Sequence, residues 1–388
     1  MSGALELKQV RLYTNPDRPV TLALNDGKIE RITTAESHQP ESPGGLSLDM
    51  QGRLAVPGMI DLHIHGAGGA DVFDGTPESL RTMSTTLGRL GTTAFLATTM
   101  INQARNNQHL AKTARMCGNS LGGAHLLGIH LEGPFINPIR RGGIQLSQIL
   151  APAVKIAREI IAMTGGSLRM MTLAPELSGM ESVIDYLHTQ PGLVLALGHS
   201  NAGYEEAQAA FQNGIHHVTH IFNALPPLNH RNPGAIAAAL ENPQVSLQAI
   251  SDGVHLHPAM LRFLYRHVGS DRIACITDGM QGIGLPDGRY FYGELEYESL
   301  NGTARFPDGT LIGSTLSLWD VVRRYHQFTG CSLAEAVTSG SEIPARILGL
   351  ESSKGRLLPG YDADLLILEP DLSLYMVVIS GQIVYRKT

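Results

Sequence analysis

The chain carries a His-x-His pair that could bind a metal ion. His63 and His65 end an apolar run at 55–65 and are followed by Gly66. Residues two apart in a β-strand point to the same face, so both imidazoles are expected to face one point. A pair of polar residues that only closes a strand is the simpler alternative. We favour metal binding because the pair follows an apolar run and precedes a glycine.

Four further polar residues stand at or just past apolar runs. Glu132 occurs in GIHLEGPF, His199 in ALGHS, His220 in HHVTHIFNA and Asp278 in CITDGM. A buried carboxylate such as Glu132 is costly without a cation or a donor beside it. Each residue alone could be a strand cap. Together they offer the histidines, the carboxylate and the second, free carboxylate that a catalytic Zn²⁺ or Fe²⁺ site needs.

Parallel strands that end at one face would bring these residues together. The apolar, strand-like runs lie at 55–65, 92–100, 126–135, 168–176, 194–200, 217–223, 245–254 and 273–278. Helical stretches such as ESLRTMSTTLGRL and GYEEAQAAFQNG separate most of them. This alternation predicts an α/β fold of the (β/α)₈ TIM-barrel type, with the active site at the carboxyl ends of the strands. A doubly wound open sheet is the alternative.

Both ends of the chain have a different pattern. Apolar and polar residues alternate at 5–14, 20–32, 363–371 and 375–388, and Asn25-Asp26-Gly27 is typical of a hairpin turn. We therefore predict a small β-domain built from residues 1–54 and 352–388. Residues 55–351 would form the barrel domain.

Composition excludes several functional classes. The 388 residues carry 29 Lys and Arg against 35 Asp and Glu, a net charge of −6, which argues against binding to nucleic acid or an anionic membrane. No apolar run is long enough to span a bilayer, and MSGALELKQV lacks the apolar core of a signal peptide. Cys117, Cys275 and Cys331 are few and far apart, which indicates a reduced, cytoplasmic protein without a cysteine zinc site. Neither GxGxxG after the first strand nor GxxxxGK[ST] occurs.

Longer motifs resemble the N-acetylglucosamine-6-phosphate deacetylases of the amidohydrolase superfamily. They are HLEGPF, GHSNAGYEEA, THIFNAL, NPGAIAAAL, SDGVHLHP, TDGM…GLPDG and GTLIGSTLSLWDVV, in this order between about residues 56 and 365. The resemblance implies a (β/α)₈ barrel with a small β-sandwich formed by both termini. It also implies hydrolysis of N-acetyl-D-glucosamine 6-phosphate to D-glucosamine 6-phosphate and acetate, in amino-sugar catabolism.

The resemblance implies roles for individual residues. Asp278 matches the catalytic acid/base of the family. The expected metal ligands are Glu132, His199, His220, His63 and His65. Family members that keep the His-x-His pair can hold a second metal, so one or two ions per chain are expected, with Zn²⁺ favoured and Fe²⁺ as the alternative.

A second set of positions is expected to hold the sugar phosphate. These residues are Gly143, Asn223, Ala224, Arg231, His255, Ile312, Gly313 and Ser314. In the family the arginine reaches into the neighbouring subunit's site. The resemblance therefore implies a homodimer in which Arg231 reaches the partner's site.

The chain departs from the family at one position. Family members usually carry a His or Gln about twelve residues after the metal-binding Glu, where it donates a hydrogen bond to the amide carbonyl. This chain has Ile144 there, followed by Gln145. Either a one-residue shift of the loop brings Gln145 into the site, or the contact is lost.

Three other functions compete with this interpretation. Deacetylation of the galactosamine epimer differs at one hydroxyl group, and the sequence does not reject it. A dihydroorotase-like cyclic amidohydrolase would need a carboxylated Lys in the fourth strand, and LRMMTLAPE has none. A non-catalytic sugar-phosphate-binding relative would be expected to lack metal ligands or the acid/base, and all of them are present here.

Overall fold

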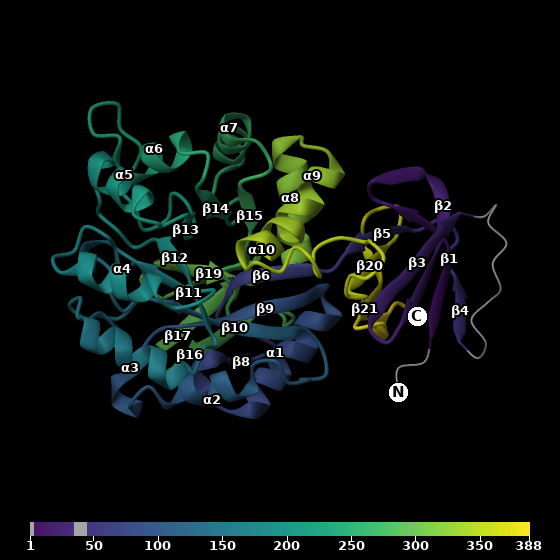
Figure 1. Ribbon diagram of the computed structural model, residues 1–388, viewed down its shortest axis with the longest axis horizontal. Helices are drawn as coiled ribbons and strands as arrows, with labels where there is room; N and C mark the ends of the chain where they lie inside the picture. Colours follow the sequence, from purple (N-terminus) through teal and green to yellow (C-terminus); the bar gives the residue numbers. More distant parts are fainter. Residues whose placement is uncertain (1–3, 35–44, 294) are drawn as a thin grey trace.

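The structure is a computed structural model that describes residues 4–34, 45–293 and 295–388. A barrel with surrounding helices forms the larger part, and strands from both chain ends form a separate sheet beside it (Figure 1). The two chain ends thus meet in one unit, as the alternating patterns predicted. Of the helices in the described ranges, none combines the length and the apolar character needed to cross a membrane.

Eight parallel strands form the barrel sheet, in the order β15-β14-β13-β12-β11-β10-β9-β6. They are β6 (Met59–Ile64), β9 (Thr92–Thr99), β10 (His125–Glu132), β11 (Leu168–Leu173), β12 (Val194–Leu197), β13 (His217–Val218), β14 (Ser246–Ala249) and β15 (Ile273–Cys275). Each predicted run overlaps one of these strands, so the predicted (β/α)₈ barrel is confirmed. Side chains such as Leu62, Leu96, Met170 and Ile250 fill its interior.

Helices follow the strands and cover the outside of the barrel (Figure 1). They are α1 (Pro77–Arg89), α2 (Gln108–Met116), α3 (Val154–Thr164), α4 (Met180–His188), α5 (Tyr204–Gln212), α6 (Gly234–Glu241), α7 (Pro258–Val268) and α8 (Leu318–Thr329). Two more helices, α9 (Leu333–Gly340) and α10 (Glu342–Ile347), lead to the terminal sheet. Short elements in the loops are β7 (Gly66–Ala67), β8 (Ala70–Asp71) and the 3₁₀ helices η1 (Val72–Asp74), η2 (Gln103–Arg105), η3 (Pro138–Arg140) and η4 (Leu146–Gln148).

The barrel closes where its first and last strands meet. Ile64 forms a parallel bridge with Gly279, and the Asp278 N–H donates to the His63 carbonyl at 3.0 Å. Below this point the buried Asp61 carboxylate accepts a hydrogen bond from the Thr277 hydroxyl at 2.6 Å. These contacts fix the end of β6 against the segment that follows β15.

The terminal sheet has the strand order β22-β21-β20-β5-β1-β2-β3, with β4 also paired to β1. Its strands are β1 (Leu5–Leu12), β2 (Asn15–Asn25), β3 (Lys28–Thr34), β4 (Leu46–Asp49), β5 (Leu54–Pro57), β20 (Leu365–Leu368), β21 (Leu374–Ile379) and β22 (Gln382–Arg386). Leu7 and Leu22 from one end of the sequence share a hydrophobic core with Leu365 and Val378 from the other. Burial of these side chains therefore joins the two termini.

The apolar run at 55–65 is divided between the two sheets. β5 pairs with β1 and β20 in the terminal sheet, whereas β6 starts the barrel. Gly58 lies between them, and a Cβ atom there would stand 2.2 Å from the Thr93 hydroxyl oxygen. The chain therefore passes from the terminal sheet to the barrel at Gly58. The domain limits of 1–54 with 352–388 and of 55–351 stay a prediction.

An antiparallel sheet that the sequence analysis did not foresee is inserted between β15 and α8. It consists of β16 (Gly288–Tyr292), β17 (Leu295–Leu300), β18 (Thr303–Arg305) and β19 (Leu311–Ser314). Met280, Tyr297 and Ala304 form its small core. Ser314 at the end of β19 bridges Gly279, so this sheet is attached to the mouth of the barrel.

Candidate active site

Two groups of side chains converge at the carboxyl ends of the barrel strands. They are His63, His65 and Asp278, and Glu132, His199 and His220. Within each group the possible ligand atoms lie within 4.8 Å of one another. All six residues predicted as metal ligands or acid/base therefore meet at one place.

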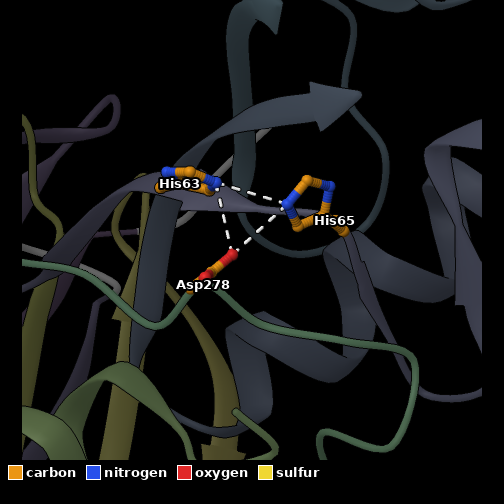
Figure 2. Close-up of side chains that lie close together, drawn as sticks. All are labelled: His63, His65 and Asp278. Carbon is orange, nitrogen blue, oxygen red and sulfur yellow. Dashed lines mark hydrogen bonds and ion pairs between the residues drawn. The ribbon is translucent and has the colours of Figure 1, made fainter. Parts of the chain in front are cut away.

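The side chains of Asp278, His63 and His65 form a triangle (Figure 2). The Oδ1 atom of Asp278 is 3.3 Å from Nε2 of His63 and 3.3 Å from Nε2 of His65. The two Nε2 atoms are 3.2 Å apart. The shared strand face predicted for this pair is thus directed at a carboxylate.

Glu132 connects the two groups. Its Oε1 atom is 3.0 Å from His199 Nε2 and 3.1 Å from His220 Nε2. The same oxygen is 3.4 Å from His63 Nε2, and Oε2 is 3.4 Å from His65 Nε2. One carboxylate therefore faces all four histidines and could be shared by two ions.

Hydrogen bonds at Nδ1 of the His199 and His63 rings indicate the protonation of the Nε2 atoms, which face the centre of the cluster. His199 Nδ1 lies 2.8 Å from the Arg140 carbonyl oxygen, which can only accept, so Nδ1 carries the proton. His63 Nδ1 similarly lies 3.2 Å from the Gln248 side-chain oxygen. The Nε2 lone pairs then face the Glu132 carboxylate, and these groups repel unless a cation lies between them. This donor set fits a divalent metal.

The electrostatics of the cluster agree with this need for positive charge. Burial lowers the pKa of His63, but the Glu132 and Asp278 carboxylates outweigh it and raise that pKa to about 9. Burial raises the pKa of Glu132, but His63 and His199 outweigh it and hold that pKa well below its usual range. Both shifts have one cause, the attraction of the buried carboxylates for positive charge, and a bound divalent cation would supply that charge.

Three of these residues adopt a strained backbone conformation. The φ angle is +47° at His199, +27° at His220 and +48° at Asp278. Left-handed φ values are uncommon for residues with a side chain and concentrate at functional sites. His199 and His220 lie two positions past the ends of β12 and β13, and Asp278 lies three positions past the end of β15, so all three residues occupy the turns that leave the barrel strands.

A second layer of hydrogen bonds lies below the cluster. His130, two residues before Glu132, places Nδ1 3.1 Å from the Leu62 carbonyl and Nε2 2.8 Å from the Thr172 hydroxyl. Thr172 in turn lies 2.7 Å from the Thr219 hydroxyl. These contacts link four strands or strand ends and hold the ligands' backbone in place.

A cavity of about 160 Å³ lies beside the cluster. Five residues predicted to bind the substrate line it: Gly143, Asn223, Ala224, His255 and Ile312. His255 is fixed by Asp252, whose carboxylate oxygen is 2.6 Å from His255 Nδ1. Its Nε2 atom is left available to the cavity.

Of the described residues predicted to bind the substrate, Arg231, Gly313 and Ser314 lie outside this lining. Arg231 is exposed in the segment that follows β13. Gly313 and Ser314 instead contact the backbone of Asp278. The Ser314 N–H donates to the Asp278 carbonyl at 2.9 Å, and a Cβ atom on Gly313 would stand 2.4 Å from the same oxygen.

The structure answers the question raised by the loop after Glu132. Ile144 lines the metal cavity, whereas Gln145 lines a neighbouring, larger cavity. The loop is therefore not shifted by one residue. Met100, Tyr292 and Phe306 also line the metal cavity, and sequence reasoning missed them. Tyr292 lies in β16 and Phe306 directly follows β18, so both come from the inserted sheet and its loops, whose position no local pattern revealed.

This arrangement agrees with the match of residues 54–384 to the family described as "Amidohydrolase family". The chain belongs to the amidohydrolase family. The expected membership of the amidohydrolase superfamily is thereby confirmed. The family match spans the barrel and most of the C-terminal strands.

Individual relatives of this amidohydrolase cover 85–99% of the chain. It is 35% identical over 395 residues to N-acetylglucosamine-6-phosphate deacetylase of Bacillus subtilis strain 168, covering 99% of this chain and 98% of the relative. It is also 35% identical over 331 residues to N-acetylgalactosamine-6-phosphate deacetylase of Escherichia coli O157:H7, covering 85% and 87%.

Solved structures extend this similarity to three dimensions. A mutant Mycobacterium smegmatis N-acetyl-D-glucosamine-6-phosphate deacetylase in complex with N-acetyl-D-glucosamine-6-phosphate has a TM-score of 0.88 and 30% identity, covering 98% of this chain and 99% of that one. The Thermotoga maritima N-acetylglucosamine-6-phosphate deacetylase has a TM-score of 0.85 and 31% identity, covering 98% and 100%. The barrel with its terminal sheet is thus the fold of these enzymes.

Proposed function

We propose that this amidohydrolase hydrolyses the acetamide of N-acetyl-D-glucosamine 6-phosphate to D-glucosamine 6-phosphate and acetate, in amino-sugar catabolism. The observation that carries the proposal is the position of Glu132 between two pairs of histidines, with Asp278 beside it at the edge of the cavity. The B. subtilis relative and the M. smegmatis structure, both N-acetylglucosamine-6-phosphate deacetylases, also support it. A non-catalytic relative would have no need to keep this cluster complete.

The two groups of side chains would hold one or two divalent ions, for which we propose Zn²⁺ with Fe²⁺ as the alternative. Glu132, His199 and His220 would hold the first ion, and His63 and His65 would contribute to a second. When bound, such a metal polarises the amide carbonyl and lowers the pKa of a water molecule.

Asp278 would move the proton. Its carboxylate borders the cavity just past the last strand of the barrel and contacts His63, whereas Glu132, the other carboxylate of the cluster, contacts all four histidines. Asp278 would take a proton from the attacking water at Oδ1 and later deliver it to the leaving nitrogen, because an amine leaves only when protonated. The strained backbone of Asp278 and its bond from Ser314 would hold the carboxylate in position for both transfers.

The phosphorylated sugar would lie on the side of the cavity formed after β13 and β14. Asn223, Ala224 and His255 border this side. His255 Nε2 would contact the phosphate, since Asp252 fixes the opposite ring nitrogen. Binding of this remote group would orient the amide at the metal cluster.

Arg231 would complete the phosphate site from a second copy of the chain, which makes the protein a homodimer. Residues 227–232 are all exposed, and Arg231 does not border the cavity of its own chain. A guanidinium forms two parallel hydrogen bonds with a phosphate. An exposed arginine on a projecting segment is suited to reach a neighbouring site.

We place the protein in the cytoplasm. Cys117, Cys275 and Cys331 are free thiols, and the last two are buried. Free thiols of this kind are typical of a reducing compartment.

An amine-release assay on the two N-acetylhexosamine 6-phosphates, side by side, tests the function. We expect a higher kcat/KM for the glucosamine derivative. A higher value for the galactosamine derivative would favour the second candidate, which the E. coli O157:H7 relative supports. Release from neither compound by the metal-loaded protein would contradict the proposal.

A further inference from the structure

A larger cavity adjoins the metal cavity. Its volume is about 740 Å³, and Gly143 and Tyr292 line both cavities. Other parts of its wall are Phe73, Ile101 and Tyr290, with the polar side chains of Asp71 and Gln281. Because Gly143 has no side chain, Tyr292 supplies the side-chain part of the shared wall.

Tyr292 is held in this position from several sides. Its hydroxyl oxygen lies 3.4 Å from Met100 Sδ and 3.5 Å from His65 Nδ1. Its ring meets the Phe73 ring edge to face, with centroids 5.4 Å apart, and the His65 ring at 5.9 Å. Contacts with residues of three other segments keep the ring between the two cavities.

This wall lies across the barrel from the proposed phosphate site. Asn223 follows β13, whereas Met100 follows β9, and these strands are four positions apart in the order of the eight-stranded barrel. A substrate with its phosphate near Asn223 and His255 and its amide at the metal cluster therefore directs its acyl group toward Met100, Ile144 and Tyr292. This step rests on the proposed function.

We propose that Tyr292 determines which N-acyl groups the enzyme hydrolyses. Its ring ends the acyl pocket just beyond an acetyl group. The larger cavity behind the ring is a subsite for longer linear acyl chains, and Tyr292 separates it from the metal cavity. Met100 and Ile144 surround the methyl group with apolar atoms on the remaining sides. An acyl chain longer than acetyl meets the Tyr292 ring before it reaches the larger cavity.

The test compares N-acetyl, N-propanoyl and N-butanoyl hexosamine 6-phosphates as substrates. In Tyr292→Ala the ratio of kcat/KM for the butanoyl to the acetyl substrate should rise by about tenfold or more, since one methylene in a fitted pocket changes discrimination by roughly 10–200-fold. Tyr292→Phe keeps the ring and should keep the wild-type ratio. Phe291→Ala is the matched control, because Phe291 lines only the larger cavity and is 62% exposed.

An unchanged ratio in Tyr292→Ala, with normal circular dichroism and metal content, would overturn this inference. Equal hydrolysis of butanoyl and acetyl substrates by the wild type would also overturn it. If Tyr292→Ala does not fold, Tyr292→Val takes its place with the same expected rise. If the wild type hydrolyses the acetyl substrate but Tyr292→Ala leaves the butanoyl-to-acetyl ratio unchanged, only the acyl subsite is refuted. If the wild type does not hydrolyse the acetyl substrate, the proposed function is refuted.

Discussion

Asp278 Oδ1 lies 3.3 Å from His63 Nε2, across the line where the first and last barrel strands meet. These residues are separated by most of the barrel sequence, and only closure of the sheet makes them neighbours. The contact places the proposed acid/base directly against a proposed metal ligand. Its consequences can be tested one residue at a time.

Asp278→Asn should lower kcat by about 10²–10⁴-fold, because an amide cannot accept the proton of the attacking water. Steady-state kinetics measures this loss. Metal analysis should still find the ion held by Glu132, His199 and His220. Asp17→Asn, an exposed change in β2, is the control. Activity within a few-fold of wild type would remove Asp278 from the mechanism.

The double variant His63→Ala, His65→Ala should contain less metal than the wild type but not lose it all. Glu132 would still hold an ion with His199 and His220. Inductively coupled plasma mass spectrometry on the purified protein gives the metal per chain. The exposed His216 offers a control substitution to Ala. One ion per chain in both wild type and double variant would show that the second site is wrong.

Arg231→Ala should lower kcat/KM for the phosphorylated sugar and hardly change the slow turnover of the unphosphorylated one. Loss of one partner from a buried charge pair costs roughly 2–5 kcal/mol. Kinetics on both sugars separates this effect from general damage. Arg266→Ala, an exposed change in α7, is the matched control.

Mixing Arg231→Ala chains with Asp278→Asn chains tests whether the arginine acts in the partner's site. A mixed dimer contains one site with an intact Asp278 and an intact Arg231 from the other chain. Activity should therefore return on mixing. Demonstrated heterodimers without recovered activity would place Arg231 in its own chain's site or outside the mechanism.

Gly313→Ala should lower both stability and kcat. The new Cβ would stand 2.4 Å from the Asp278 carbonyl oxygen, so the Asp278 segment has to move. Overpacking of this kind costs about 1–3 kcal/mol. Thermal unfolding and kinetics measure the two effects. Gly288→Ala in the same inserted sheet has ordinary van der Waals space and should change neither.

The sequence by itself determined the barrel and the metal cluster. Each apolar run encodes a buried strand, and a polar residue at its end stands out because burial there is costly. Parallel strands then carry Glu132, His199 and His220 to the same face without any further information. The alternating termini similarly indicated strands, although not which strands pair.

Tertiary structure alone decided how these parts fit around the cavity. The run at 55–65 looked continuous, yet it divides at Gly58 because β5 finds its partners in the terminal sheet. Ile144 rather than Gln145 lines the cavity beside the candidate metal ligands, and Gly313 and Ser314 contact the Asp278 backbone. Tyr292 reaches the site only because the inserted sheet is attached at Gly279. Local periodicity records which side chains are buried, but not which distant segment covers them, because that choice depends on packing between elements far apart in the chain.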